Sequence, residues 1–466
     1  MTSIKFGTDG WRGVIAKDYT FANVEIVSQA IADYVKSQSQ SSQQKLLVGY
    51  DTRFLANQFA QRVAEVLAGN GLLVDLLDRP FPTPYVSYEV KRRKLAGGVM
   101  VTASHNPPEF CGIKFKASFG GSATPAIVKE IERSLFLNPV QRANGPGLIC
   151  TISPEKEYFE HIQSLIRFDL IRQSGLRVVA DPMHGTADGL LQEILGKYGV
   201  DCRTIREKPD PLFGGVFPEP MEENLGALKD AILGHQADIG LATDGDADRL
   251  GVMDALGNYV NTHQILALLV LHLVRNRGWT GKVVKTFSQS ILIERICRKL
   301  GLEFHVVPIG FKNIADLMLR EDILIGGEES GGVGTKNHIP ERDGILVNLL
   351  MLEAVAQSRK SLRQMVLEMW QEFGEFHFER RDLHVPLAFG QDLVQSLRDT
   401  PPEQFAGFPV MRVDTLDGSK LVFQDESWIL FRQSGTEPLL RLYSEAATHE
   451  KVKQLMDEGN RLAVPG

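Results

Sequence analysis

Four short apolar segments, each running directly into a polar loop, most constrain how this chain can fold. Continuous apolar runs of this length are typical of buried strands, and helical patterns lie between them, for example at residues 58–68 and 291–300. Alternating strands and helices predict an α/β architecture, in which ligands bind outside the carboxyl ends of the strands. The predicted strands are residues 45–50, 97–101, 176–180, 239–243, 283–287, 323–325 and 427–431.

The first loop presents a serine, Ser104, where the strand at 97–101 ends. Proline fixes its own φ and restrains the residue before it, so the following Asn106-Pro107-Pro108 predicts a turn. A serine held on such a turn is a candidate nucleophile. A Ser/His/Asp triad is an alternative interpretation, but no GxSxG elbow accompanies Ser104.

The second loop carries three aspartates, Asp244, Asp246 and Asp248, directly after the strand at 239–243. Three carboxylates that converge repel one another unless a cation lies between them, and hard oxygen ligands favour Mg²⁺ or Ca²⁺. The spacing is not that of an EF-hand, which needs a twelve-residue loop with a distal glutamate. The alternative is a solvated or salt-bridged acidic turn.

The third and fourth loops are rich in glycine and hydroxyl side chains. Residues 326–332 read Gly-Gly-Glu-Glu-Ser-Gly-Gly, and such carboxylates can accept hydrogen bonds from hydroxyl groups. Residues 432–438 read Arg-Gln-Ser-Gly-Thr-Glu-Pro, which suits a phosphate. A flexible charged turn is the alternative for the third loop, and a polar hairpin loop is the alternative for the fourth. A nucleophile, a metal site, a hydroxyl-binding loop and an anion site together indicate phosphoryl transfer involving a sugar phosphate.

Composition narrows the class of protein. The length of 466 residues predicts several domains. The net charge of −7 predicts no nucleic-acid partner. Its longest apolar run, residues 265–274, is shorter than the roughly 20 residues of a membrane span and predicts a core helix. The four cysteines are scattered along the sequence, which favours reduced thiols. The first residues show no signal-peptide pattern, so we expect a cytoplasmic protein without a membrane partner.

The four loops in this order resemble the α-D-phosphohexomutase family, which includes phosphoglucomutases and phosphomannomutases. The resemblance extends from the Phe-Gly-Thr-Asp-Gly-Trp-Arg-Gly segment at residues 6–13 to the loop at 432–438. It implies three similar mixed α/β domains and a smaller C-terminal α+β domain around a central cleft. The expected domains are 1–143 with the phosphoserine loop, 144–257 with the metal loop, 258–375 with the sugar-recognition loop and 376–466 with the phosphate-binding loop.

The resemblance also implies roles at the reacting centre. Ser104 carries the phosphoryl group, and Mg²⁺ is held by an oxygen of phosphorylated Ser104 together with Asp244, Asp246 and Asp248. Lys114 is the first candidate for proton transfer, with a purely electrostatic lysine as the open alternative. Arg12, expected in a Gly-Trp-Arg-Gly turn, is a second cation unless it is only structural. Arg249 is expected to touch the phosphoserine or the substrate.

Further residues are implied in substrate binding. Glu328 and Ser330 would hydrogen-bond sugar hydroxyls, and Lys312 would contact substrate. His105 is assigned to substrate binding rather than as a base, because neighbours in sequence are not expected to face each other in a turn. The phosphate that is not transferred would be held by Arg432, Ser434, Gly435 and Thr436.

The reaction that the resemblance implies is the interconversion of glucose 1-phosphate and glucose 6-phosphate, with glucose 1,6-bisphosphate as intermediate and activator. Dual-specificity members typically carry Gly-Glu-Met-Ser-Gly-His, whereas Glu329 and Gly332 replace the methionine and histidine here. This favours the phosphoglucomutase branch. Phosphomannomutase activity, a glucose 1,6-bisphosphate synthase that uses fructose 1,6-bisphosphate, and a non-catalytic sugar-phosphate binding protein stay open. Sugar phosphates are the expected partners, and the chain is expected to be a monomer or homodimer.

Overall fold

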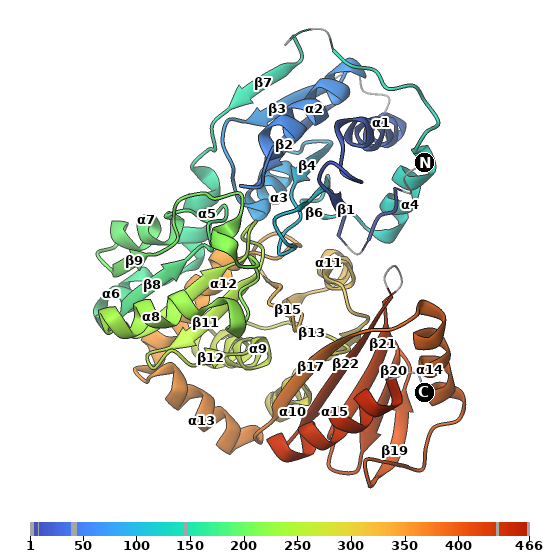
Figure 1. The fold of residues 1–466 in the computed structure, drawn as a ribbon. Helices are drawn as coiled ribbons and strands as arrows, with labels where there is room; N and C mark the ends of the chain where they lie inside the picture. The colour runs from blue at the N-terminus through green and yellow to red at the C-terminus, as the bar shows by residue number, and fades with distance from the viewer. Residues whose placement is uncertain are drawn as a thin grey trace. The chain divides into compact units, whose positions relative to one another are not determined.

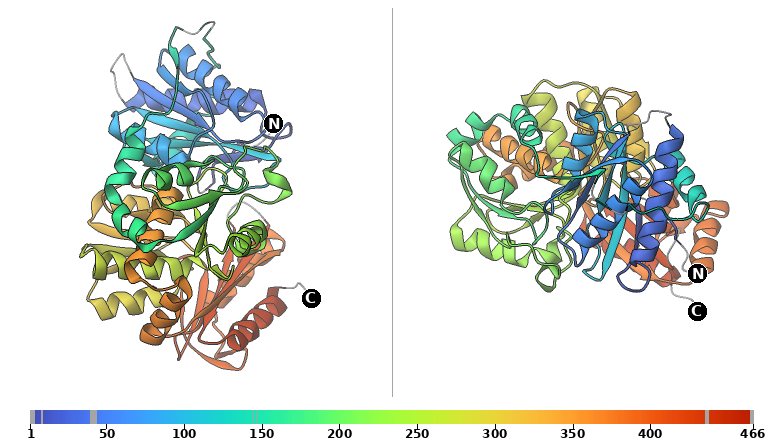
Figure 2. Two further views of the ribbon diagram at one scale, coloured as in Figure 1. Left: turned by 90° about the vertical axis from the view of Figure 1, so that its left-hand side faces the viewer. Right: turned by 90° about the horizontal axis from the view of Figure 1, so that it is seen from above.

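A computed structural model describes residues 4–7, 9–38, 44–143, 145, 147–434 and 438–463. The chain forms two compact units (Figure 1; Figure 2), the first made of residues 1–280 and 310–365 and the second of residues 281–309 and 366–466. Each unit has its own hydrophobic core.

The first sheet of unit 1 contains the strand that leads to Ser104. Its central strands are parallel and fully buried, which is why they read as continuous apolar runs. The strand order is β1 (Trp11–Val14), β5 (Phe110–Ala117), β4 (Gly97–Val101), β2 (Lys45–Tyr50), β3 (Leu73–Leu77) and β7 (Ile149–Ile152), with β6 (Gly121–Ser122) paired to β5. The helices of this region are α1 (Phe21–Gln38), α2 (Ala56–Gly69), α3 (Thr83–Arg92) and α4 (Pro125–Ser134).

The second sheet of unit 1 contains the strand that leads to the three aspartates. Strand β10 runs parallel to β8 and antiparallel to β11. The strand order is β12 (Tyr259–Val260), β11 (Leu250–Asp254), β10 (Ile239–Thr243), β8 (Arg177–Asp181) and β9 (Asp201–Thr204). The helices here are α5 (Glu157–Leu165), α6 (Phe168–Ser174), α7 (Leu190–Lys197), α8 (Gly226–His235) and the 3₁₀ turns η1 (Phe213–Gly215) and η2 (Glu222–Asn224).

The rest of unit 1 supplies the glutamate loop. Strand β15 (Ile323–Gly327) pairs antiparallel with β16 (Val333–Thr335), so residues 328–332 form the turn between them. The surrounding helices are α9 (Thr262–Leu271), which continues as the π-helix η3 (His272–Asn276), α11 (Phe311–Arg320) and α12 (Gly344–Ser358). Helix α13 (Leu362–Phe373) crosses from unit 1 into unit 2.

Unit 2 is built on a six-stranded antiparallel sheet (Figure 1, orange and red). Side chains alternate across it: Ile429 and Phe431 pack with Leu455 of α15, whereas Trp428 and Leu430 pack with Phe287. The strand order is β17 (His377–His384), β22 (Leu439–Ala446), β21 (Trp428–Gln433), β20 (Ser419–Phe423), β19 (Phe408–Asp414) and β18 (Gln404–Phe405). The other elements are β13 (Lys282–Thr286), β14 (Phe304–Val307), α10 (Ile291–Leu300), α14 (Leu387–Asp399) and α15 (His449–Ala463).

The predicted α/β class is confirmed, and the strands at 45–50, 97–101 and 239–243 begin and end where predicted. The prediction of a turn at Arg12 is wrong, because Arg12 lies in β1 and pairs with Gly112 of β5. The fourth loop also begins later than predicted, since β21 continues through Arg432 and Gln433. All four cysteines are free. Among the described residues, every helix is too short or too polar to cross a membrane.

Candidate active site

Ser104 lies just beyond β4, fully buried, in a left-handed backbone conformation with φ of 54°. That conformation is costly for a residue with a Cβ atom, so the surrounding contacts must hold it. Its Oγ donates a hydrogen bond of 2.8 Å to Asp244 Oδ2. The two loops approach so closely that a Cβ atom at Gly245 would lie 2.7 Å from the Ser104 carbonyl oxygen, and only glycine fits there.

The three aspartates converge as the sequence predicts. One carboxylate oxygen from each of Asp244, Asp246 and Asp248 lies within 4.8 Å of the others, and all three residues are buried. Asp246 Oδ1 and Asp248 Oδ1 accept no hydrogen bond from the described residues. Burial raises the pKa of Asp244 well above its ordinary value, and Asp248 and Asp246 add to this by repulsion. Buried, orphaned carboxylate oxygens of this kind fit a hard divalent cation such as Mg²⁺.

Lys114, on β5, is a buried cation that contacts two of the three aspartates. Its Nζ lies 2.7 Å from Asp246 Oδ2, 2.9 Å from Asp248 Oδ2 and 3.1 Å from Asp9 Oδ2. Burial alone would lower the pKa of Lys114, but the three carboxylates outweigh it and hold the pKa above its ordinary value. A lysine in this state keeps its proton, which favours the electrostatic alternative over proton transfer.

Arg342 and Asp9 belong to the same cluster, and neither is among the predicted site residues. Arg342 Nη2 lies 2.6 Å from both Asp9 Oδ2 and Asp248 Oδ2, and its Nη1 lies 3.4 Å from Glu328 Oε2. Asp9 stands in the segment at 6–13 that carries part of the resemblance, so its place was a usable signal. No motif pointed to Arg342, which precedes the residue that caps α12.

The glutamate loop is attached by its backbone to the chain that follows the aspartates. Glu328 N donates to Gly332 O at 2.9 Å, and Leu250 N donates to Gly331 O at 3.2 Å. Burial raises the pKa of Glu328 to about 7, although Arg342 opposes the shift. Ser330 lies in the same turn. Unit 1 therefore brings the first three loops together.

The remaining predicted residues of unit 1 lie around this cluster. Arg12 donates through Nη1 to Asn106 Oδ1, and Arg249 Nη1 lies 3.0 Å from Glu219 Oε1. His105 Nδ1 lies 3.5 Å from Ser104 Oγ, so the expectation that these neighbours do not face each other is wrong. Burial lowers the pKa of His105 well below its ordinary value, helped by nearby arginines, so the ring is neutral at pH 7. Lys312 lies in the first turn of α11.

The fourth loop belongs to unit 2. Arg432 Nε lies 3.0 Å from Asp417 Oδ2, and Ser434 N donates to Leu439 O at 2.9 Å. Gly435 and Thr436 lie outside the described residues. Phosphate binding by this loop therefore stays a prediction.

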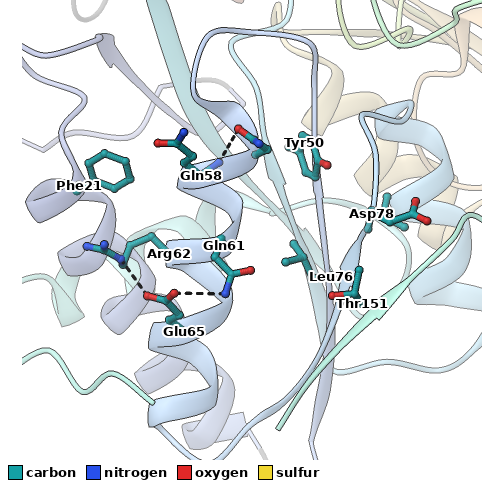
Figure 3. A pocket seen from close by; sticks show the side chains of 11 residues that line it. Phe21, Tyr50, Gln58, Gln61, Arg62, Glu65, Leu76, Asp78 and Thr151 are labelled. Carbon is teal, nitrogen blue, oxygen red and sulfur yellow. Dashed lines mark hydrogen bonds and ion pairs between the residues drawn. The ribbon is translucent and has the colours of Figure 1, made fainter. Parts of the chain in front are cut away.

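A hollow of about 490 Å³ lies beside α2 (Figure 3). Figure 3 shows Gln58, Gln61 and Arg62 on the helix and Tyr50, Asp78 and Thr151 across from it. None of the predicted site residues lines this hollow. The candidate site is defined instead by side chains that converge from three loops.

Comparison with known proteins agrees with this arrangement. Models of the four phosphoglucomutase/phosphomannomutase domains match residues 3–139 (α/β/α domain I), 156–257 (domain II), 261–373 (domain III) and 393–461 (C-terminal domain). A "probable phosphoglucosamine mutase" from Pyrococcus abyssi is 31% identical over 98% of this chain and 97% of its own length. A phosphoglucomutase/phosphomannomutase from Thermococcus kodakarensis is 29% identical over 98% of both chains.

A solved structure shows the same similarity in three dimensions. The crystal structure of a proposed phosphomannomutase from Thermus thermophilus has 37% sequence identity, covers 99% of both chains and superposes with a TM-score of 0.88. The relatives carry different sugar names, so they agree on the class of reaction and not on the sugar. The chain belongs to the phosphoglucomutase/phosphomannomutase family and is a phosphotransferase mutase.

Proposed function

We propose that the enzyme interconverts glucose 1-phosphate and glucose 6-phosphate through phosphorylated Ser104. The observation that carries this proposal is the convergence of Ser104 Oγ, 2.8 Å from Asp244, with two further aspartates and the fixed cation Lys114. A phosphoryl group on this hydroxyl would need positive charge beside it, which Lys114 supplies directly and the three aspartates would supply through a bound cation.

In the proposed first transfer, the Ser104 O–P bond breaks and a bond forms between phosphorus and the oxygen of the free sugar hydroxyl, whose proton ends on the serine oxygen. The product is glucose 1,6-bisphosphate, and transfer of its other phosphoryl group back to Ser104 yields the isomer. Lys114 and Arg342 would offset negative charge as the phosphoryl group moves. Asp244, Asp246 and Asp248 would hold Mg²⁺, which supplies further charge neutralisation when bound.

Preference for glucose is supported by the residues of the sugar-recognition loop. Glu328 is buried beside Arg342, and Glu329 follows where dual-specificity members have methionine. A buried carboxylate that binds a sugar hydroxyl discriminates strongly against an analogue that lacks the hydroxyl. Mannose differs from glucose only in the configuration at C2, so the proposed choice of glucose over mannose rests on Glu329 in place of methionine. The relatives named for mannose and glucosamine phosphates make these two sugars the necessary competitors in any test.

The test is a coupled assay of glucose 6-phosphate formation from glucose 1-phosphate with Mg²⁺, with and without added glucose 1,6-bisphosphate. Mannose 1-phosphate and glucosamine 1-phosphate are compared at equal concentration, and Ser104→Ala is the control variant. We expect the highest kcat/KM with glucose and no turnover above background by the variant. A higher kcat/KM for another sugar would overturn the glucose assignment. Slow turnover with bisphosphate accumulating from fructose 1,6-bisphosphate would favour the synthase instead.

A further inference from the structure

A buried arginine outside the predicted site, Arg53, makes an unusually complete set of contacts with the serine loop. Arg53 follows β2 and is 3% exposed. Its Nη2 donates to the carbonyl oxygens of Ser104 at 2.7 Å and Asn106 at 2.6 Å, and its Nη1 donates to those of Pro107 at 2.7 Å and Phe110 at 2.9 Å. With Nε bound to a carboxylate, all five guanidinium N–H groups have a partner.

The carboxylate partner of Arg53 holds the other side of Ser104. Asp51 Oδ2 accepts from Arg53 Nε at 3.1 Å and from Thr102 Oγ1 at 2.6 Å. Thr102 Oγ1 in turn accepts from the backbone N–H of Ser104 at 2.8 Å. The backbone N–H and C=O of Ser104 are therefore both tied, directly or through one hydroxyl, to the Asp51–Arg53 pair.

We infer that Arg53 is a positioning residue for phosphoryl transfer, acting with Asp51 and Thr102 to hold the Ser104 backbone in its left-handed conformation. This inference rests on the proposed function of Ser104. A strained conformation persists only where several contacts determine it, and four of the five donors of Arg53 bind carbonyl groups of this loop. Lysine has three donors on one nitrogen, so it cannot reproduce this pattern.

Loss of these contacts affects where the phosphoryl group goes. A displacement of about 1 Å at a reacting atom lowers the rate of a positioned transfer about 100-fold, without a comparable change in substrate binding. Transfer to water needs no such alignment: the Ser104 O–P bond breaks, a bond forms between the water oxygen and phosphorus, and the proton of water passes to the serine oxygen. A loosened loop therefore favours inorganic phosphate over sugar phosphate.

The experiment compares Arg53→Lys, Thr102→Val and Thr102→Ser with the wild type. Valine matches the shape of threonine without its hydroxyl, and serine keeps the hydroxyl. Arg277→Lys is the matched control, because the side chain of Arg277 in unit 1 is only 6% exposed and donates from Nε to Glu353 Oε1 at 2.7 Å, away from the serine loop. The measurements are kcat and KM for glucose 1-phosphate, and the rate at which phosphorylated enzyme releases inorganic phosphate without sugar.

We expect Arg53→Lys to lower kcat about 100-fold with KM changed less than about 3-fold. Its phosphate release relative to sugar transfer should rise at least about 10-fold, because transfer to water depends less on alignment. Both measurements should change in the same direction in Thr102→Val, and Thr102→Ser should restore most of the activity.

If Thr102→Val and folded Arg53→Lys match Arg277→Lys in both measurements, the inference is overturned. Failure of Arg53→Lys to fold leaves the Thr102 pair to decide. If the wild type is active and Ser104→Ala is equally active, the proposed function is overturned instead.

Discussion

Two buried lysines, Lys114 in unit 1 and Lys420 in unit 2, show how the surroundings decide what a buried amino group does. Lys114 Nζ lies within 3.1 Å of three carboxylates, and its pKa is held above the ordinary value. Lys420 Nζ donates to the Phe287 carbonyl oxygen at 2.7 Å and lies 3.8 Å from the centre of the Trp428 ring. Burial lowers the pKa of Lys420 to about 7, and Lys285 adds to this by repulsion.

The difference teaches that burial alone does not predict the charge of a lysine. Removal from water disfavours the charged form in both places, and only the nearby carboxylates reverse the effect at Lys114. Lys114 is therefore suited to act as a fixed positive charge, whereas Lys420 changes its charge near neutral pH.

The largest expected effect is that of Lys114→Met. It leaves buried Asp246 without its cation, and Asp248 and the partly buried Asp9 keep their contacts with Arg342. Breaking a buried ion pair in this way costs about 3–5 kcal/mol of unfolding free energy. We expect activity to fall about 100- to 1,000-fold as well, in line with loss of a preorganised charge. Urea unfolding with and without Mg²⁺ measures the stability. Lys420→Met is the control, and equal stability losses for the two variants would contradict the comparison.

A pH series separates the two lysines further. With a folded-state pKa of about 7 against an ordinary value near 10.5, Lys420 binds fewer protons in the folded than in the unfolded protein between these pH values. Stability conferred by Lys420 therefore rises with pH over that window, by at most about 1.4 kcal/mol per pH unit. From pH 7 to 10, the unfolding free energy of the wild type should therefore increase relative to that of Lys420→Met. A difference independent of pH would contradict the lowered pKa.

Glu328 extends the comparison to a carboxylate, whose effect on stability is expected over a narrower pH range than that of Lys420. Its pKa is raised from about 4.5 to about 7, so the folded protein holds a proton that the unfolded protein loses between these pH values. Its contribution to stability is thus present below pH 4.5 and is lost as pH rises to 7, again by at most about 1.4 kcal/mol per unit. Glu328→Gln should remove this slope, as measured by urea unfolding from pH 4.5 to 7.5. An unchanged slope would mean that other groups cause it.

Much of the candidate site could be predicted because its residues follow strands directly. Ser104 follows β4 of the first sheet and the three aspartates follow β10 of the second, so a local pattern places each at the carboxyl end of a strand. The turn predicted at Arg12 failed because glycines on both sides suggested a bend, whereas pairing with β5 extends the segment. Local propensity yields to such pairing, which depends on residues far along the chain.

The sequence by itself determined the family and the α/β class and pointed to the residues proposed to carry the chemistry, because short motifs keep their spacing along the chain. Only the tertiary structure decided which of these residues are charged and which other residues hold them in place. Lys114 meets Asp246 across 132 residues, Arg342 meets Asp248 across 94, and Arg53 meets Ser104 across 51. The sign of a pKa shift and the hold on a strained backbone depend on distances of a few ångströms between such residues, and sequence spacing carries no information about those distances.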